Sequence, residues 1–192
     1  MNKRAYTQAL DALIACFSAG RKLLLCGNGG SAADCAHIVG ELAKGFEKTR
    51  PLAEDVQAAI GEPWAQQLQR GLPAIDLTAN NALISAIIND IDGQSIYAQQ
   101  VMAYGQAGDV MIGISTSGNA ENVRRALVTA RARGLTTIAL TGAGGGKLKE
   151  LCDIWLSVDA TRTADVQQLH LALYHQLCRD IESALFYTDS KH

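Results

Sequence analysis

The segment KLLLCGNGGSAADCAH, residues 22–37, runs from a short apolar stretch through a glycine-rich turn into a more polar stretch. Residues 22–26 lie between glycines, which is typical of a strand buried on both faces in a parallel sheet. The next helix is expected to begin at Ala32, and Ser31 and Asp34 have capping-box spacing. Glycines let the backbone approach a ligand closely, and N–H groups at a helix start suit an anion. The residues expected to hold a phosphate here are Asn28, Gly29, Gly30 and Ser31.

The same strand-then-helix alternation continues along the chain. A first helix is expected over about residues 2–19 and a last, long helix over about 163–186. Alternating strands and helices imply right-handed crossovers and parallel strands. We therefore expect one α/β domain over residues 1–192, with a doubly wound parallel sheet of about five strands flanked by helices, flavodoxin-like or Rossmann-like. The other strands are expected at residues 74–77, 109–114, 136–140 and 154–158, and the other helices from about residue 80 and over 119–133.

One stretch, residues 47–71, interrupts this rhythm. Its helical pattern is broken at Gly61 and Pro63, so we interpret it as an irregular, partly helical excursion between elements. No internal repeat or low-complexity tract suggests a further division of the chain.

Length and composition are those of a globular protein, with 192 residues, 48% of them hydrophobic and 19% charged. The formal net charge is −2 and acids and bases are interspersed, which argues against nucleic acid as a partner. The apolar runs are far shorter than the roughly 20 residues that cross a bilayer, so we expect no membrane association. Five cysteines without a C-x-x-C pair fit neither a disulfide framework nor a thiolate zinc site and favour the cytoplasm.

A second loop, ISTSGNAENV over residues 114–123, also lies between an expected strand and an expected helix. Its side chains suit phosphate oxygens at a helix N-terminus. The alternative is that Ser117 or Asn119 merely caps the helix. Neither loop matches the P-loop or the dinucleotide fingerprint, and GAGGGK, residues 142–147, is interpreted as a flexible turn. The hydroxyl and amide groups of this second loop belong to Ser115, Thr116, Ser117 and Asn119.

The two loops together resemble the sugar isomerase (SIS) domain, and phosphoheptose isomerases in particular. The resemblance runs from Gly20 to Glu182 and includes GLPAIDL at residues 71–77, the Asn89-Asp90 pair and LTGAGGGKL at residues 140–148. It implies that the Ser-Thr-Ser loop holds the phosphate of a sugar-phosphate substrate. Such an enzyme moves a proton between adjacent carbons through an enediol, for which a carboxylate and a histidine are suitable groups.

Two expected helices carry such groups. His37 and Glu41 are spaced i, i+4 and project from one helix face, and from the residues alone they could be a solvated pair. Gln167 and His175 lie two turns apart on the last helix. The resemblance implies a zinc site, one ion per subunit, at His37, Glu41, Gln167 and His175, with Glu41 and His175 as the proposed base and acid. Nitrogen and oxygen ligands of this kind are accepted by zinc.

The resemblance also implies a set of substrate-binding residues. Asn89 and Asp90 could alternatively just close a helix. Ala120 stands where a serine is common in the family, and Ala164 stands where an aspartate is common, which bears on the substrate more than on the fold. The implied substrate-binding residues are Asn28, Gly29, Gly30, Ser31, Glu41, Asn89, Asp90, Ser115, Thr116, Ser117, Asn119, Ala120 and Gln167.

The function implied by the resemblance is conversion of D-sedoheptulose 7-phosphate to D-glycero-D-manno-heptose 7-phosphate, for lipopolysaccharide or capsule heptose, by a cytoplasmic homotetramer. One alternative is an isomerase of another sugar phosphate. Another is a non-catalytic SIS protein, such as those that associate with the bacterial replication initiator, but these lack the carboxylate and histidine that Glu41 and His175 supply. A SIS-type sugar-phosphate sensor would need a helix-turn-helix domain, for which we find no room.

Overall fold

In the computed structural model, which describes residues 2–187, five parallel strands form one sheet in the order β2-β1-β3-β4-β5. The strand order reverses between β1 and β3, which is the flavodoxin-like form of a doubly wound sheet. The predicted fold class is therefore confirmed. The domain predicted over residues 1–192 includes residues 1 and 188–192, which lie outside the described residues. The strands are β1 (Leu23–Gly27), β2 (Ala74–Asp76), β3 (Val110–Ser115), β4 (Thr136–Thr141) and β5 (Ile154–Ser157).

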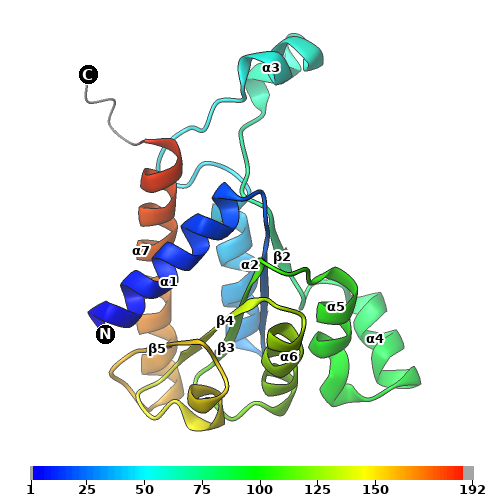
Figure 1. Ribbon diagram of the computed structural model, residues 1–192, viewed down its shortest axis with the longest axis vertical. Helices are drawn as coiled ribbons and strands as arrows, with labels where there is room; N and C mark the ends of the chain where they lie inside the picture. The colour runs from blue at the N-terminus through cyan, green and yellow to red at the C-terminus, as the bar shows by residue number, and fades with distance from the viewer. Residues whose placement is uncertain (1, 188–192) are drawn as a thin grey trace.

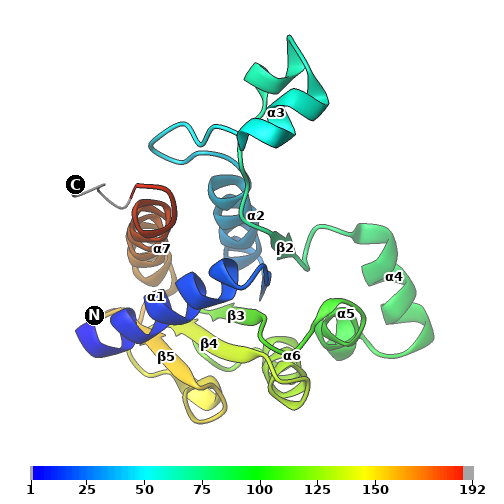
Figure 2. The same cartoon turned by 45° about the horizontal axis from the view of Figure 1, so that its top comes forward.

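Helices cover both faces of this sheet (Figures 1 and 2). On one face lie α1 (Lys3–Ser18), α2 (Gly30–Leu42) and α7 (Thr163–Phe186), and on the other lie α5 (Ile96–Tyr104) and α6 (Glu121–Ala132). Within residues 2–187, none of the helices combines the length and the apolar character that crossing a bilayer would require. The remaining helical elements are α3 (Glu54–Ile60), α4 (Asn81–Asp90) and the short 3₁₀ turns η1 (Trp64–Gln67), η2 (Gly93–Ser95) and η3 (Gly146–Glu150).

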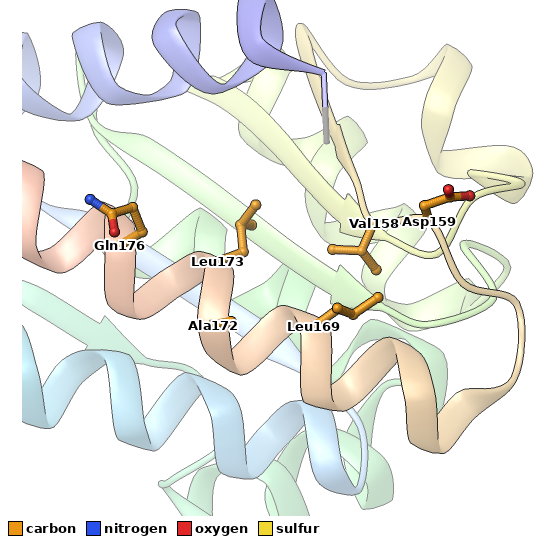
Figure 3. A pocket seen from close by; sticks show the side chains of 6 residues that line it. All are labelled: Val158, Asp159, Leu169, Ala172, Leu173 and Gln176. Atoms are coloured by element: carbon orange, nitrogen blue, oxygen red, sulfur yellow. The ribbon is translucent and has the colours of Figure 1, made fainter.

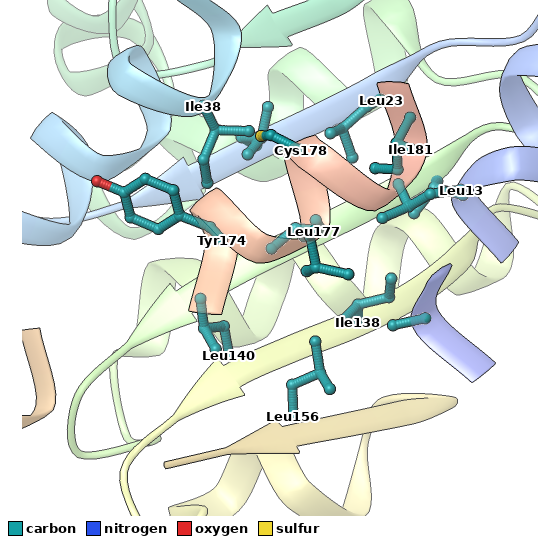
Figure 4. Close-up of a cluster of buried hydrophobic side chains, with 14 of the residues drawn as sticks. Leu13, Leu23, Ile38, Ile138, Leu140, Leu156, Tyr174, Leu177, Cys178 and Ile181 are labelled. Atoms are coloured by element: carbon teal, nitrogen blue, oxygen red, sulfur yellow. The ribbon is translucent and has the colours of Figure 1, made fainter. Parts of the chain in front are cut away.

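The two faces of the sheet form two hydrophobic clusters, because successive strand residues point to opposite sides. On the first face, α7 packs its apolar stripe against the sheet, α1 and α2. Figure 4 shows Leu177 of α7 close to Ile138 of β4, and Ile181 of α7 close to Leu13 of α1 and Leu23 of β1, all of them buried. On the second face, buried residues of α6 such as Leu127 pack against the strands. Each fully buried side chain of this kind contributes about 1.5–3 kcal/mol, so the α7 stripe fixes that helix firmly.

The observed starts of α1 and α2 can be compared with those predicted from the sequence. At α1, the side chain of Asn2 accepts N–H groups of Arg4 and Ala5, a cap consistent with the predicted start. At α2, the N-cap is Gly29, with φ +56°, and the helix begins at Gly30 instead of Ala32. Ser31 is buried within the first turn, so the capping box expected from Ser31 and Asp34 is wrong.

The excursion over residues 47–71 projects from the body as an arm that carries α3 (Figure 1). No residue of α3 is buried, so the arm is held at its base. There, the carboxylate of Glu182 on α7 accepts the N–H groups of Phe46 and Glu47 and lies 2.8 Å from Nε of Arg50. Arg50 is fully buried (0% exposed) and also donates to the carbonyl oxygen of Leu42 at 2.8 Å. This buried ion pair ties the arm to the last helix.

We predict that Glu182→Gln lowers the free energy of unfolding by about 3–5 kcal/mol at pH 7, because it leaves the Arg50 guanidinium buried without its counter-charge. Burial acts to raise the pKa of Glu182, but the N–H donors and Arg50 outweigh it and hold the pKa below the ordinary 4.5. The contribution of a carboxylate with a lowered pKa is complete above pH 4.5 and is lost as the pH falls through the folded-state value. The deficit of the variant should therefore shrink in acid.

Chemical denaturation from about pH 3 to pH 7 measures both effects. The matched control is Glu47→Gln, since Glu47 is half exposed, pairs with Arg179 at 3.3 Å and should contribute less than about 1 kcal/mol. A variant Glu182→Gln as stable as Glu47→Gln at pH 7 would contradict the role of the buried pair.

Candidate active site

The two predicted phosphate loops meet at the carboxyl ends of β1 and β3. These strands are direct neighbours, with Gly27 opposite Ile114, and the loops leave them at the point where the strand order reverses. In open α/β sheets this is where ligands bind. Between the loops lies a small hollow of 100 Å³, a size that suits a phosphate group. Its lining residues are Asn28, Ser31, Ile114, Ser115, Thr116 and Ala120.

The chemistry of this hollow suits an anion although its lining includes no charged side chain. The two helices α2 and α6 both begin here, and their N-termini carry partial positive charge. Their N-cap residues, Gly29 and Ala120, make no side-chain cap hydrogen bond. The hydroxyl groups of Ser31, Ser115 and Thr116 add neutral donors.

Hydrogen bonds hold the first loop in place. The side-chain amides of Asn28 and Asn122 pair reciprocally at 2.9 Å, and the hydroxyl of Tyr97 lies 2.6 Å from the carbonyl oxygen of Gly27 and 3.1 Å from Oδ1 of Asn28. Neither Asn122 nor Tyr97 was among the predicted site residues. Asn122 belongs to the second loop motif and could have been suspected, whereas Tyr97 is 69 residues from Asn28 and no local pattern marks it.

The Ser-Thr-Ser loop rests on the turn formed by residues 142–147. The N–H of Leu148 donates to the carbonyl oxygen of Gly118 at 3.1 Å, and the N–H of Lys147 donates to Oδ1 of Asn119 at 3.2 Å. Asn119 therefore bonds to this turn instead of capping α6, and Ser117 does not cap it either, so the cap alternative is wrong. Ser117 and Asn119 are exposed.

A second group of predicted residues meets where α2 packs beside α7. Nε2 of His37 lies 3.1 Å from Oε1 of Glu41 and 3.3 Å from Nε2 of His175. One ligand atom from each of the three lies within 4.8 Å of the others, so the cluster could hold a metal ion. Two imidazole nitrogens and a carboxylate oxygen form a donor set that fits zinc. The structure thus brings three of the four predicted metal ligands together.

The protonation of the cluster is compatible with this use. Burial, and next the neighbouring His37, lower the pKa of His175, which favours a neutral imidazole near pH 7. A neutral imidazole can bind a metal or accept a proton. Burial also lowers the pKa of His170, which is fully buried one turn earlier on α7 and lies outside the cluster.

Gln167, the fourth predicted ligand, belongs to α7, and its side chain lies beside the start of α2. Its Nε2 is 2.2 Å from the place where a Cβ on Gly30 would stand, so in this conformation the amide packs directly against Gly30. Gly30 is about 10 Å along the α2 axis from His37. Both His37 and Gln167 line one open hollow of 570 Å³ between α2 and α7, together with Asp34 and Tyr174.

Asn89 and Asp90 lie apart from both groups. They form the C-terminal end of α4, are exposed, and bond to each other at 2.7 Å. Figure 2 shows α4 beyond α5, away from α2 and α7. Their position is compatible with the alternative that they close a helix.

Another hollow, of 410 Å³, lies on the side of α7 that faces α1 and the end of β5 (Figure 3). It is mainly apolar and contains none of the predicted site residues. It therefore has no part in the candidate site. Its lining residues are Val158, Asp159, Leu169, Ala172, Leu173 and Gln176.

Fold and site together define an α/β protein with a phosphate-sized hollow at its topological switch point and a His–Glu–His cluster between α7 and α2, the helix that begins at this hollow. Comparisons with known proteins agree. The SIS domain family matches residues 2–142. Phosphoheptose isomerase of Rhodospirillum rubrum is 40% identical over 181 residues, which cover 94% of this chain and 86% of that protein. Phosphoheptose isomerase of Nitratidesulfovibrio vulgaris (Hildenborough) is 46% identical over 167 residues, covering 87% and 71%.

Solved structures give the same result. The phosphoheptose isomerase of Neisseria gonorrhoeae superposes with a TM-score of 0.78 and 36% identity, and that of Francisella tularensis with 0.80 and 33%. Each match covers 94% of this chain and 86% of the other. The chain therefore belongs to the SIS domain superfamily and, within it, to the phosphoheptose isomerase family.

The contact between the Ser-Thr-Ser loop and its supporting turn can be tested at Gly118. This residue has φ +68°, and a Cβ would stand 2.0 Å from the carbonyl oxygen of Gly145. We predict that Gly118→Ala costs more than about 1 kcal/mol of stability and weakens binding of inorganic phosphate, because the loop must move. Calorimetric titration and chemical denaturation measure the two effects.

The control is Gly144→Ala in the same turn, where an added Cβ would meet no atom within 4 Å. It should bind phosphate as the unaltered protein does. Equal phosphate affinity in Gly118→Ala would show that the loop geometry is not what binds the anion.

Proposed function

We propose that the protein is an aldose–ketose isomerase that converts D-sedoheptulose 7-phosphate to D-glycero-D-manno-heptose 7-phosphate through an enediol. The observation that supports this most is that one helix, α2, begins at the phosphate-sized hollow and carries His37 and Glu41 further along. Ser31 and His37 are about 9 Å apart along its axis, comparable to an extended seven-carbon sugar phosphate. Relatives called phosphoheptose isomerase support the choice of substrate.

In this proposal the phosphate is held by the two loops and the sugar extends along α2. Asn28, Ser31, Ser115 and Thr116 bind the phosphate with the N-termini of α2 and α6. We extend the binding role to the other predicted residues of these loops, which are Gly29, Gly30, Ser117, Asn119 and Ala120. Asn89 and Asp90 are proposed to contact sugar hydroxyl groups.

Proton transfer is assigned to the His–Glu–His cluster. The carboxylate of Glu41 accepts a proton from C1 of the ketose and returns it to C2, while His175 moves a proton between the two oxygens. Zinc is the metal we propose for His37, Glu41, His175 and Gln167, one ion per subunit, where it would act as a Lewis acid on the substrate oxygens. Gln167 could join this set from its place in the same hollow by a change of side-chain conformation.

We further propose a cytoplasmic homotetramer with active sites at subunit interfaces, supplying heptose for lipopolysaccharide or capsule. Free cysteines at all five positions agree with a reducing compartment. The arm exposes large apolar side chains, Val56, Trp64 and Leu68, which a second subunit could cover. The exposed position of Asn89 and Asp90 is also consistent with a site shared between subunits.

The role of Glu41 is tested with Glu41→Gln. We predict that kcat for sedoheptulose 7-phosphate falls by at least about 100-fold, because proton transfer at carbon is lost, while folding is retained. Glu54→Gln, an exposed carboxylate on the arm, is the control and should leave kcat unchanged. If Glu41→Gln keeps full activity, Glu41 is not the base; if the unaltered protein binds the sugar phosphate without turnover, a non-catalytic binding protein is the better account.

The fourth metal ligand is tested with Gln167→Ala. We predict that protein purified without chelator contains about one zinc per subunit and that Gln167→Ala weakens zinc affinity at least about tenfold. Gln176→Ala, on the exposed side of the same helix, should leave the affinity unchanged. Equal affinities for the two variants in a chelator competition would remove Gln167 from the ligand set.

A further inference from the structure

On the side of His37 away from the His–Glu–His cluster, Nδ1 belongs to a chain of hydrogen bonds that includes Tyr174 and Asp34. The hydroxyl oxygen of Tyr174 lies 2.9 Å from Nδ1 of His37 and 3.3 Å from Oδ1 of Asp34. Tyr174 is buried on α7 (2% exposed), while Asp34 lies one turn before His37 on α2. The two helices are thus linked through one hydroxyl group.

The direction of these bonds follows from the donors available. Burial raises the pKa of Asp34 above its ordinary 3.8. Once ionised, its carboxylate only accepts, so the single hydroxyl proton of Tyr174 is donated to Asp34. The hydroxyl oxygen can then only accept from His37, which requires the imidazole proton on Nδ1. Nε2 of His37 then keeps its lone pair, 3.1 Å from Oε1 of Glu41 and 3.3 Å from Nε2 of His175. A metal-binding imidazole needs this arrangement. The carboxylate of Glu41 also only accepts and by itself favours a proton on Nε2, an effect that the Tyr174–Asp34 pair opposes.

Asp34 is the group that decides between the two tautomers. Without it, the Tyr174 hydroxyl could donate to Nδ1, and the proton on Nε2 would be donated to Glu41 instead. The second oxygen of Asp34, Oδ2, is buried and has no hydrogen-bond partner among the described residues. Burying an unpaired carboxylate oxygen costs stability, and orientation of Tyr174 is a reason for placing it there.

We propose that Tyr174, oriented by Asp34, is a positioning residue that holds His37 as the Nδ1–H tautomer with Nε2 free to bind a metal. The proposal deepens the proposed function and rests on its metal site. Neither residue was among the predicted site residues. Tyr174 touches no reacting atom in this account and acts only through His37.

The first measurement is the tautomer of His37 in zinc-free protein, read from the nitrogen-15 NMR signals of its ring at about pH 8, above the ordinary imidazole pKa. We expect a protonated Nδ1 and an unprotonated Nε2 in the unaltered protein. Asp34→Ala should move the proton toward Nε2. A protonated Nε2 in the unaltered protein would overturn the proposal.

The second measurement is zinc affinity by chelator competition in Tyr174→Phe, which keeps the ring and removes the hydroxyl. We expect affinity to fall by about 10- to 100-fold, with an altered visible spectrum of the cobalt-substituted protein. The matched control is Tyr6→Phe, since the Tyr6 hydroxyl also donates to a carboxylate, that of Asp180 at 2.5 Å, between α1 and α7. Equal affinity in Tyr174→Phe and Tyr6→Phe would overturn the proposal.

The tautomer and zinc-affinity measurements test the positioning role of Tyr174 separately from the isomerase function. The tautomer is measured without metal or substrate, so it reports on Tyr174 and Asp34 even if sedoheptulose 7-phosphate is not turned over. Conversely, an active isomerase whose zinc affinity is indifferent to Tyr174→Phe would keep the proposed function and remove the positioning role.

Discussion

The parallel pairing of β1 with β3 is the constraint on which the site depends. It places Gly27 opposite Ile114, so that the two loops after these strands leave the sheet side by side although they are almost ninety residues apart. Because the strand order reverses here, the helices that follow lie on opposite faces and both direct their N-termini at one small hollow. In the proposed function this hollow binds the phosphate through backbone N–H groups and hydroxyl groups. Gly118 allows the close approach of the turn at residues 142–147 to the second loop.

The packing of α2 against α7 brings the His–Glu–His cluster together beside the proposed phosphate site. The same hydrophobic cluster contains Ile38 of α2 and Leu177 and Cys178 of α7, so the relative position of the two helices is set by close packing. His37, Glu41 and His175 lie at the polar edge of that contact, and their spacing follows from it. The core of the protein therefore positions the groups that the proposed proton transfer requires, with little help from flexible loops.

Local sequence patterns predicted most of the strands and helices. Where these predictions were wrong or incomplete, the reasons are physical. The strands β1, β3 and β4 are buried on both faces and therefore read as apolar runs in the sequence. All five strands were located to within one or two residues. The start of α2 was misplaced because Gly29, with its positive φ, takes the cap position that Ser31 was expected to hold. Contacts between distant residues leave no local trace: Arg50 pairs with Glu182 across 132 positions, and the residues that orient His37 and Asn28 were missed for the same reason. The family resemblance, and not any spacing, linked His175 to α2.

The most direct measurement is incubation of the purified protein with sedoheptulose 7-phosphate in deuterated water, followed by NMR of the product. The account predicts a new aldose, D-glycero-D-manno-heptose 7-phosphate, with deuterium at C2, because the enediol takes up a proton that the base has exchanged with solvent. Absence of any aldose, with the sugar phosphate still bound, would contradict the claim that this phosphate hollow and this His–Glu–His cluster form one isomerase site.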